Sequence, residues 1–220
     1  MKIWILGMLL AVSFCIGCGL KSKIDLPATT GSGVTKTDSR NIVGFKKINS
    51  ANAIELHVSV TNGYSIVVKA DDDIIANVIT KLDGDTLVLS LKEGTNTKSK
   101  ISVSVTLPTL EGLDLTGATN ATVTGVKSDE LTINATGAAK AKIDGETKSL
   151  KIKAVGASSV DAENLKAEKA AVESVGASSV TVEASGELDA SAVGASHVVY
   201  IGEPKTLKQN ATDVSTISKK

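Results

Sequence analysis

The sequence predicts an all-β protein whose main part is a parallel β-helix, a solenoid with coils of about 18 to 20 residues. The first observation is that the hexapeptide Val-Gly-Ala-Ser-Ser-Val occurs at residues 155–160 and again at residues 175–180. The second is that apolar residues alternate with polar ones around each copy, which is the period of a strand. The third is that Gly recurs between these strands, where a turn needs a residue without a Cβ atom.

The N-terminus predicts a lipoprotein signal peptide over residues 1–17, with lipid attachment at Cys18. One Lys precedes an apolar run over residues 3–16, which is short for a membrane span. The segment from Cys15 to Cys18 is similar to a bacterial lipobox, although Cys15 stands where Leu is usual. A plain secretory peptide is the alternative. Both cysteines lie in this segment, so the mature body can form no internal disulfide.

Residues 18–41 are expected to be the lipidated cysteine and a flexible tether. Residues 19–41 contain Pro, Gly, Ser and Thr without a sustained period, which is typical of a linker. An acylated Cys18 would anchor the protein to a membrane permanently, because each buried CH₂ contributes about 0.8 kcal/mol. A flexible tether of this length has a root-mean-square span of roughly 26 Å, so the domain would lie just off the membrane.

The folded domain is expected over residues 42–217, with a less regular β half at residues 42–108 and a repeat half at residues 109–217. In the first half, alternating apolar residues bounded by turns such as Asn-Gly and Asp-Gly predict short strands. These strands are expected at residues 54–60, 64–70, 85–91 and 100–108.

The repeat half consists of units that align on a Gly-Ala pair. Each unit has two pairs of alternating apolar positions, which predicts two short strands and two turns per coil. An isolated unit cannot bury its apolar face, whereas stacked units can. The aligned units begin at Thr116, Thr136, Val155, Val175 and Val193, and a degraded sixth begins at Gln209. The inward position that follows each turn is predicted at Ala121, Ala141, Val160, Val180, Val198 and Val214. Ser158, Ser159, Ser178 and Ser179 are expected outside the core or capping the turns.

One segment conflicts with this assignment on local propensity. Residues 161–174 are rich in Ala, Glu and Lys, which favours a helix. The equivalent segments of the neighbouring units contain Gly and strand alternation, and stacked neighbours override local propensity. We therefore expect a turn followed by a strand here.

Two passages of the sequence are similar to a known family. The repeated turn is Thr-Gly-Ala-Thr-Asn-Ala at residues 116–121 and Val-Gly-Ala-Ser-Ser-Val at residues 155–160, and residues 44–73 place a Phe before a strand, a Gly turn and a second strand. These features resemble the bacterial autotransporter-adhesin head GIN domain family, over residues 42–217. The typical turn of that family is Ser-Gly-Ser-Gly-Asp-Val, whose second Gly and Asp are mostly replaced here. The resemblance implies a right-handed, pectin-lyase-like superhelix that is exported, often lipid-anchored, and used in cell-surface adhesion.

A carbohydrate-active enzyme is the main alternative, because hydrolysis of a glycosidic bond needs two carboxylates that face one sugar. Asp144, Asp161 and Glu183 lie near the ends of first strands in successive coils and are the candidates for a stacked acidic face. A solvated acidic ladder is the simpler interpretation. Lyase chemistry favours basic residues, but Arg40, the sole arginine, lies in the predicted tether, and Lys140 and Lys142 are interpreted as solvated.

Metal and nucleic-acid functions have little support. His57 and His197 are the only histidines and are far apart, so a zinc site is not expected. The run Asp71-Asp72-Asp73 lacks the spaced ligands of a calcium loop and is interpreted as a solvated turn. The 24 basic and 24 acidic residues balance, which gives no electrostatic attraction for nucleic acid. The three Asn-Ala-Thr sequons, at Asn120, Asn134 and Asn210, are interpreted as products of a Thr-rich repeat.

The sequence thus predicts a non-catalytic lipoprotein of the bacterial cell envelope, lipid-anchored at the outer membrane or the cell surface. No catalytic residue, cofactor or metal is assigned. Glycans or surface proteins are the expected partners, and its exterior of Ser, Thr, Asn and Lys suits many weak hydrogen bonds. Self-association through an open sheet edge at the last coil is a further alternative.

Overall fold

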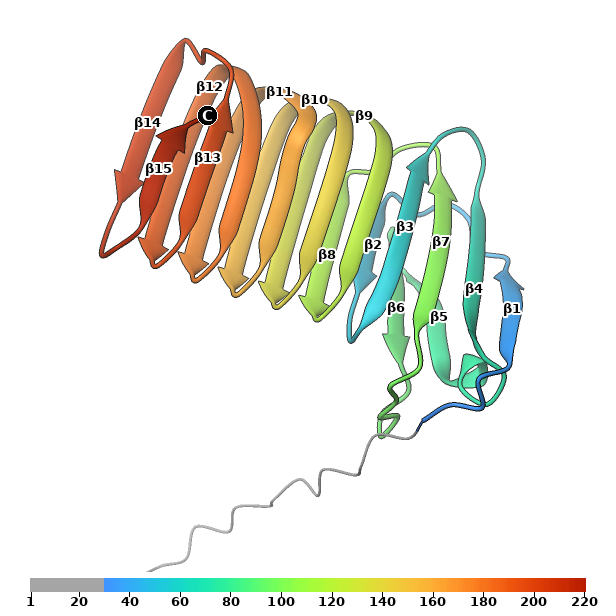
Figure 1. The fold of residues 1–220 in the computed structure, drawn as a ribbon. Coiled ribbons are helices and arrows are strands. Elements are labelled where there is room, and N and C mark those ends of the chain that lie inside the picture. The colour runs from blue at the N-terminus through green and yellow to red at the C-terminus, as the bar shows by residue number, and fades with distance from the viewer. Residues whose placement is uncertain (1–29) are drawn as a thin grey trace, which may run out of the picture.

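The computed structural model describes residues 30–220, and its strands stack into an elongated solenoid (Figure 1). The predicted all-β solenoid is therefore confirmed. The signal peptide predicted over residues 1–17, Cys18 and residues 19–29 of the expected tether lie outside the described residues. Among residues 30–220, no helix is long and apolar enough to cross a membrane.

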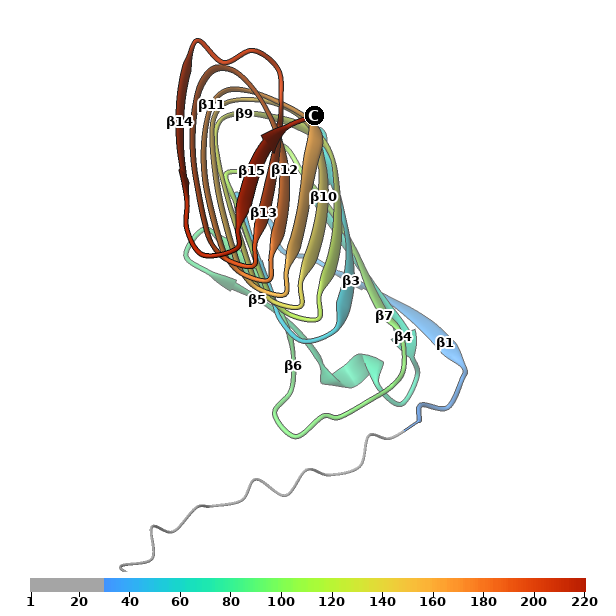
Figure 2. The ribbon, with the colours of Figure 1, turned by 60° about the vertical axis from the view of Figure 1, so that its left-hand side comes forward.

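Two sheets enclose the core (Figure 2). The front sheet of Figure 1 contains β1, β4, β7, β3, the first parts of β9 to β12, β13 and β15, whereas the back sheet contains β5, β6, β2, β8, the second parts of β9 to β12, and β14. In the less regular half the elements are β1 (Thr35–Arg40), β2 (Lys47–Ser50), β3 (Ile54–Val60), β4 (Ser65–Asp71), the 3₁₀ turn η1 (Ile75–Asn77), β5 (Val78–Asp83), β6 (Thr86–Leu91) and β7 (Ile101–Leu107). The repeat half contains β8 (Gly112–Gly117), β9 (Asn120–Gly137), β10 (Lys140–Gly156), β11 (Ser159–Gly176), β12 (Ser179–Gly194), β13 (His197–Ile201), β14 (Thr206–Ala211) and β15 (Thr216–Lys219).

The less regular half joins the repeats through parallel pairing. β3 pairs in parallel with β7 and β9, and β2 pairs in parallel with β6 and β8. On the front sheet β4 runs the other way, because it is antiparallel to β7, and β1, which is antiparallel to β4, runs again in the direction of β7. Phe45 is fully buried where the chain enters β2, and its ring meets Tyr64 edge-on at 5.1 Å between centroids. The strands predicted in this half are present at nearly the expected bounds.

The tether expected up to residue 41 is wrong at its C-terminal end. Residues Thr35–Arg40 form β1, which lies in register with β4 from Thr35 opposite Asp71 to Arg40 opposite Ile66. Polar composition concealed this strand because its side chains are exposed or half-buried, and its backbone pairing holds it in place.

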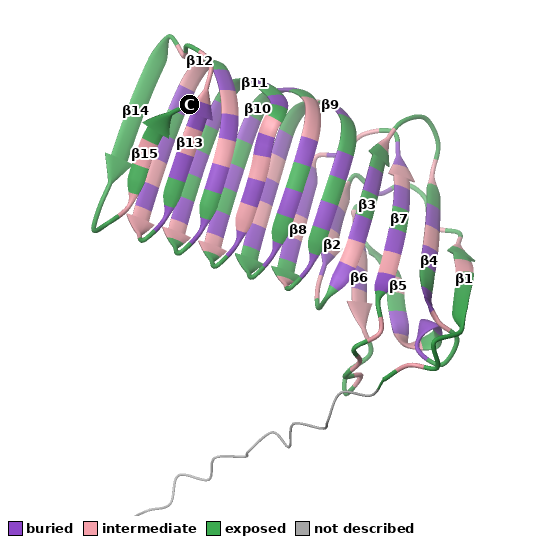
Figure 3. Cartoon of the chain, viewed as in Figure 1, coloured by how far each residue is buried: buried purple, intermediate pink, exposed green. Residues whose placement is uncertain are grey.

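Each of β9 to β12 follows a whole coil, up the front sheet and down the back one. The parallel ladders place inward residues directly above one another, including Ala121, Ala141, Val160, Val180 and Val198 on the front sheet. Figure 3 shows the resulting alternation of buried and exposed residues along each strand. Residues 161–174 belong to β11 and are extended throughout, so the expected strand is confirmed, although the chain rounds the corner without a separate turn.

The alignment of the sixth unit is wrong by three residues. Val198 lies opposite Ile217, whereas Val214 is 73% exposed. The turn of this coil is formed around Asp213, a non-Gly residue with φ of 61°, whose carboxylate accepts a hydrogen bond from Gly194 N–H at 3.2 Å. An Asp in this conformation was not detectable by a search for Gly.

The Gly-Ala turns stack at the lower ends of the strands and depend on glycine. Gly176 has φ of +92°, and a Cβ atom there would lie 2.9 Å from the carbonyl oxygen of Gly156. A side chain at this position is therefore unfavourable for two reasons. The backbone has a positive φ, and a Cβ atom would clash with the carbonyl group of the preceding coil.

A column of hydroxyl groups closes these turns from the inside. The Ser178 hydroxyl lies 3.1 Å from Val175 O in its own turn, 3.2 Å from Ala154 O of the preceding coil, and 2.8 Å from the Ser174 hydroxyl. Thr119, Ser196 and Ser215 make the same pair of contacts to their own and an earlier coil. Ser178 thus caps its turn and is fully buried, whereas Ser179 is exposed.

A second stack at the opposite corner carries alternating charge. Lys127, Glu146, Lys166 and Glu183 are aligned by register. Two positions later in each of three coils the signs are reversed, at Asp129, Lys148 and Glu168. Each side chain thus has an opposite charge in the neighbouring coil, with 3.7 Å between Lys127 Nζ and Glu146 Oε1 and 2.7 Å between Lys148 Nζ and Asp129 Oδ1. This alternation favours one stacking register over a slipped one.

We expect Ser178→Ala to lower the free energy of unfolding by about 1 to 2 kcal/mol, because it leaves the buried Ser174 hydroxyl and two carbonyl groups without this partner. Ser158→Ala is the matched control. Ser158 is 2% exposed, but its hydroxyl has no hydrogen-bond partner among the described residues, and Ala139 fills the equivalent place one coil earlier. Urea unfolding should show a change within about 0.5 kcal/mol for this control. Equal losses in the two variants would contradict the proposed role of the hydroxyl column.

We expect Lys148→Glu to lower the melting temperature, since it places three negative charges in a row with Asp129 and Glu168. The loss should be larger at low salt, because these side chains are exposed and screened by ions. The triple variant Asp129→Lys, Lys148→Glu, Glu168→Lys restores the alternation and should recover most of the loss in thermal unfolding. A loss that is independent of salt and not recovered would argue against the charge pattern.

Candidate binding groove

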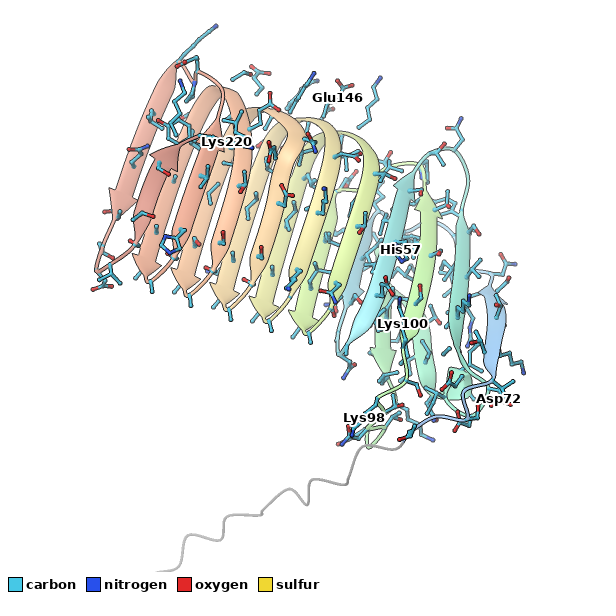
Figure 4. The ribbon with its side chains drawn as sticks, viewed as in Figure 1. His57, Asp72, Lys98, Lys100, Glu146 and Lys220 are labelled. Atoms are coloured by element: carbon cyan, nitrogen blue, oxygen red, sulfur yellow. The ribbon has the colours of Figure 1, made fainter. Side chains whose placement is uncertain are left out.

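A groove of about 1030 Å³ runs along the upper corner of the solenoid, where the coils pass from the front sheet to the back sheet. Glu146 marks this corner in Figure 4. The groove is lined by Lys47, Thr109, Glu111, residues 127–130, Thr132, residues 146–148, residues 166–168 and Ser185. It therefore crosses several coils and ends against the start of the back sheet.

The floor of the groove is low because each coil places a small residue at the same point. Ser128, Thr147 and Ala167 are aligned by register, and Ser185 donates a hydrogen bond to Ala167 O at 3.3 Å. Thr147 and Ala167 are buried, at 6% and 3% exposure, whereas Ser185 is exposed. This column of small side chains leaves a channel between longer ones.

The walls of the groove are the two columns of alternating charge. Within one coil Lys127 and Asp129 face each other across the small residue Ser128, and the next coil presents Glu146 and Lys148 in the opposite order. The hydrogen bond to Asp129 raises the pKa of Lys148, so this ammonium group is charged at neutral pH. The groove is accordingly polar, rich in donors and acceptors, and close to neutral in sum.

The closed end of the groove has two further ion pairs. Lys46 Nζ lies 2.9 Å from Glu111 Oε1, and this hydrogen bond raises the pKa of Lys46. Lys47 Nζ lies 3.1 Å from Asp85 Oδ2, and this hydrogen bond lowers the pKa of Asp85. Both shifts favour the charged forms of the Lys46 ammonium group and the Asp85 carboxylate.

The acidic candidates from the sequence do not stack as expected. Asp161 lies opposite Lys142 and Thr181, and Asp144 lies opposite Asn164. Glu183 has Lys166 and Ile201 as its neighbours. The register of β10 against β11 shifts between Lys142 and Asp144, which moves Asp144 and Asp161 out of alignment. Such a bulge cannot be recognised from the sequence of a single chain.

Each of two acidic candidates has a local structural partner. Asp144 Oδ1 accepts a hydrogen bond from Gly125 N–H at 2.8 Å, and Asp161 Oδ1 accepts one from Glu163 N–H at 3.1 Å. These carboxylates cap corners of the front sheet. Lys140 and Lys142 are exposed on the same sheet, and Arg40 pairs with Asp38 at 3.1 Å.

The two histidines lie at separate places on the front sheet. His57 Nε2 is 3.5 Å from Glu55 Oε1, and Lys100 Nζ is 2.7 Å from the other oxygen of Glu55. The hydrogen bond from Lys100 lowers the pKa of Glu55. His197 instead contacts the Thr216 hydroxyl at 2.7 Å. Within the described part of the chain no three His, Cys, Asp or Glu residues are arranged to hold a metal ion.

The remaining candidates are also separated in the structure. Asn120 and Asn210 are exposed on different sheets, and Asn134 donates a hydrogen bond to Asp114 at 2.6 Å. The run Asp71-Asp72-Asp73 lies at the lower edge of the molecule, far from Glu146 (Figure 4). None of these residues lines the groove.

The groove was missed at the level of sequence, although a signal was present. The tripeptides Lys-Ser-Asp, Glu-Thr-Lys and Lys-Ala-Glu recur at about the coil spacing, each with a small residue between opposite charges. Only the stacking of the coils turns these tripeptides into a floor and two walls.

Several solved structures have the same fold. A crystal structure described as a "putative adhesin" from Bacteroides fragilis NCTC 9343 superposes with a TM-score of 0.75 at 20% identity, covering 88% of this chain and 100% of that one. A "putative adhesin" from Parabacteroides merdae ATCC 43184 has a TM-score of 0.57 at 17% identity, over 88% and 99% of the two chains. A "putative lipid binding protein" from Parabacteroides distasonis ATCC 8503 has a TM-score of 0.55 at 18% identity, over the same shares. At these identities the likeness concerns the fold alone.

The comparison with family models identifies the family and not only the fold. No relative was found among the curated proteins with which the chain was compared. The family model described as "Putative auto-transporter adhesin, head GIN domain" matches residues 44–204, which include the buried Phe45, both halves of the solenoid and all five Gly-Ala turns. With this match over most of its length, the chain belongs to the auto-transporter adhesin head GIN domain family.

Proposed function

We propose that this protein is a non-catalytic, lipid-anchored module of the bacterial cell surface that binds glycans or surface proteins in the groove. The observation that carries the proposal is a channel across several coils whose floor is small and whose walls present Lys, Asp, Glu, Ser and Thr. Such walls hydrogen-bond to hydroxyl groups and to polar protein surfaces. Membership of an adhesin family and the predicted lipid attachment at Cys18 support the same role.

The groove suits weak contacts that add up over many molecules. The residues that line it include no aromatic side chain, so a sugar ring would be held by hydrogen bonds without stacking. Single-site affinity is then low, and display of many copies on one membrane raises the effective strength. A carbohydrate-active enzyme is less well supported, because Asp144, Asp161 and Glu183 do not converge on one place.

We expect Ser185→Trp to weaken ligand binding at least tenfold, because a large ring at this exposed position fills the channel. Ser179→Trp is the matched control, since Ser179 is an exposed serine of the same strand, β12, on the other sheet. Wild type and both variants are tested on an array of bacterial and host glycans and on immobilised matrix proteins. A wild type that binds nothing, or variants that lose binding equally, would argue against the groove.

We expect Cys18→Ser to move the protein from the membrane fraction to the soluble fraction and to abolish incorporation of radiolabelled palmitate. The physical reason is the loss of the acylated cysteine, whose chains provide the anchor. Cys15→Ser is the control, because this residue precedes the proposed cleavage site and should leave labelling unchanged. Wild-type protein that carries no label would contradict the anchor and leave the groove proposal standing.

A further inference from the structure

The acidic run Asp71-Asp72-Asp73 has a structural partner that the sequence did not suggest. The run lies at the end of β4, and the chain from Gly31 to Val34 passes directly against it. We refer to residues 71–73 with Ser99 as the clasp, and to residues 31–34 as the strap. Figure 4 shows Asp72 at the lower edge of the molecule, beside the first described residues.

Successive groups of the strap donate hydrogen bonds to the clasp. The N–H group of Ser32 donates to Asp73 Oδ1 at 3.3 Å, the Ser32 hydroxyl donates to Asp72, and Gly33 N–H donates to Asp71 Oδ2 at 3.3 Å. In the reverse direction, the N–H group of Asp72 donates to Val34 O at 2.9 Å. Backbone N–H groups in sequence are good partners for carboxylates, so the three adjacent negative charges are each satisfied.

Ser99 completes the clasp from a third part of the chain. Its hydroxyl donates to Asp71 Oδ2 at 2.8 Å and accepts the N–H group of Gly31 at 3.0 Å. The approach is close, because a Cβ atom on Gly31 would lie 2.0 Å from Asp71 Oδ2 and 2.1 Å from Ser99 Oγ. A side chain at residue 31 would therefore push apart the two groups that form the clasp.

The clasp and the groove lie at opposite ends of the strands. β4 runs antiparallel to β7, and β7 runs parallel to β3, so the end of β4 is level with the start of β3. β3 is in turn aligned with the start of β9, at the edge of the Gly-Ala turns. The groove lies beyond the other end of these strands, and seven residues of β3 span roughly 20 Å. Figures 1 and 4 show the same separation between the lower and upper edges.

We infer that the clasp fixes the point at which the chain leaves the domain and thereby turns the groove away from the membrane. This inference rests on the proposed anchor at Cys18. With Gly31 held, 13 residue steps separate the anchor from the fold, a reach of at most about 45 Å. Without the clasp the tether would run to Thr35, where β1 begins opposite Asp71, so the anchor would lie 17 residue steps and at most about 60 Å from the same edge.

The edge that would then face the membrane has a suitable surface. The Gly-Ala pairs of its five stacked turns are uncharged and their Ala side chains are exposed, while the carboxylates of residues 71–73 at the same edge accept hydrogen bonds from the strap. The groove, with its alternating charges, faces the surroundings, where a glycan or a partner protein has access to it. The exposed alanines are Ala118, Ala138, Ala157, Ala177 and Ala195.

Hydrogen exchange on the mature chain tests the clasp without a membrane. Gly31→Ala and Asp71→Ala should each raise the exchange rate of the Ser32, Gly33 and Val34 amides at least tenfold, while amides of β3 and β7 keep their wild-type rates. Thr30→Ala is the control next to the strap and should change none of these rates. Wild-type amides that exchange at the rate of an unstructured peptide would overturn the clasp.

The orientation is tested on lipidated protein in phosphatidylglycerol and phosphatidylethanolamine vesicles. A dye on Ala157→Cys, at the Gly-Ala edge, should be quenched by a headgroup quencher at least threefold more than a dye on Ser185→Cys, at the groove. Adding Gly31→Ala should lower this ratio but keep it above one, because the tether gains four residues while β1 still holds the chain at the same edge. Equal quenching in otherwise wild-type protein would overturn the orientation, whereas failure of vesicle retention would overturn the anchor and the orientation together and leave the exchange result to decide the clasp.

Discussion

In-register parallel pairing of one coil on the next is the interaction on which this structure depends. A single coil has two short apolar strips and no partner for them, so it gains stability only when the next coil covers it. The backbone ladders from β9 to β12 fix that stacking residue by residue. Inward side chains are consequently piled on their equivalents, and even alanine is sufficient to fill the narrow interior, as Ala121, Ala141 and Ala190 do.

The two corners of the coil use different chemistry to maintain this register. In its five Gly-Ala turns the lower corner has glycine at a positive φ, and buried hydroxyl groups such as those of Ser178 and Ser196 are bonded to two coils at once. The upper corner is exposed and charged, and its side chains alternate in sign from coil to coil. At the upper corner, long charged side chains stand on both sides of a column of small ones, and this arrangement forms the groove. The charged residues that maintain the register therefore also form the walls of the proposed binding site.

In the proposed function, the N-terminal segment connects this architecture to the cell envelope. β1 extends the front sheet by one antiparallel strand, and the strap before it is held by three adjacent aspartates and Ser99. An acidic turn without a partner would be costly in a compact fold, because like charges repel. Here the hydrogen-bond donors of the strap offset that repulsion. The run of three aspartates, for which the sequence suggested no role, thereby holds the segment that joins the domain to the proposed tether.

The sequence by itself determined the repeat architecture, because the Gly-Ala turns and the alternating apolar residues recur at the length of one coil. This period can be detected even where one copy of the turn motif has changed. It also settled residues 161–174 as strand, since equivalent units outweighed local helix propensity. Only the tertiary structure decided what lies side by side across coils: the bulge that separates Asp144 from Asp161, the register of Ile217 in place of Val214, and the pairing of Gly31 with Ser99. The physical reason is that spacing along the chain reports the period of a solenoid, whereas bulges, polar turns without glycine and contacts over 68 residues depend on packing that no local pattern encodes.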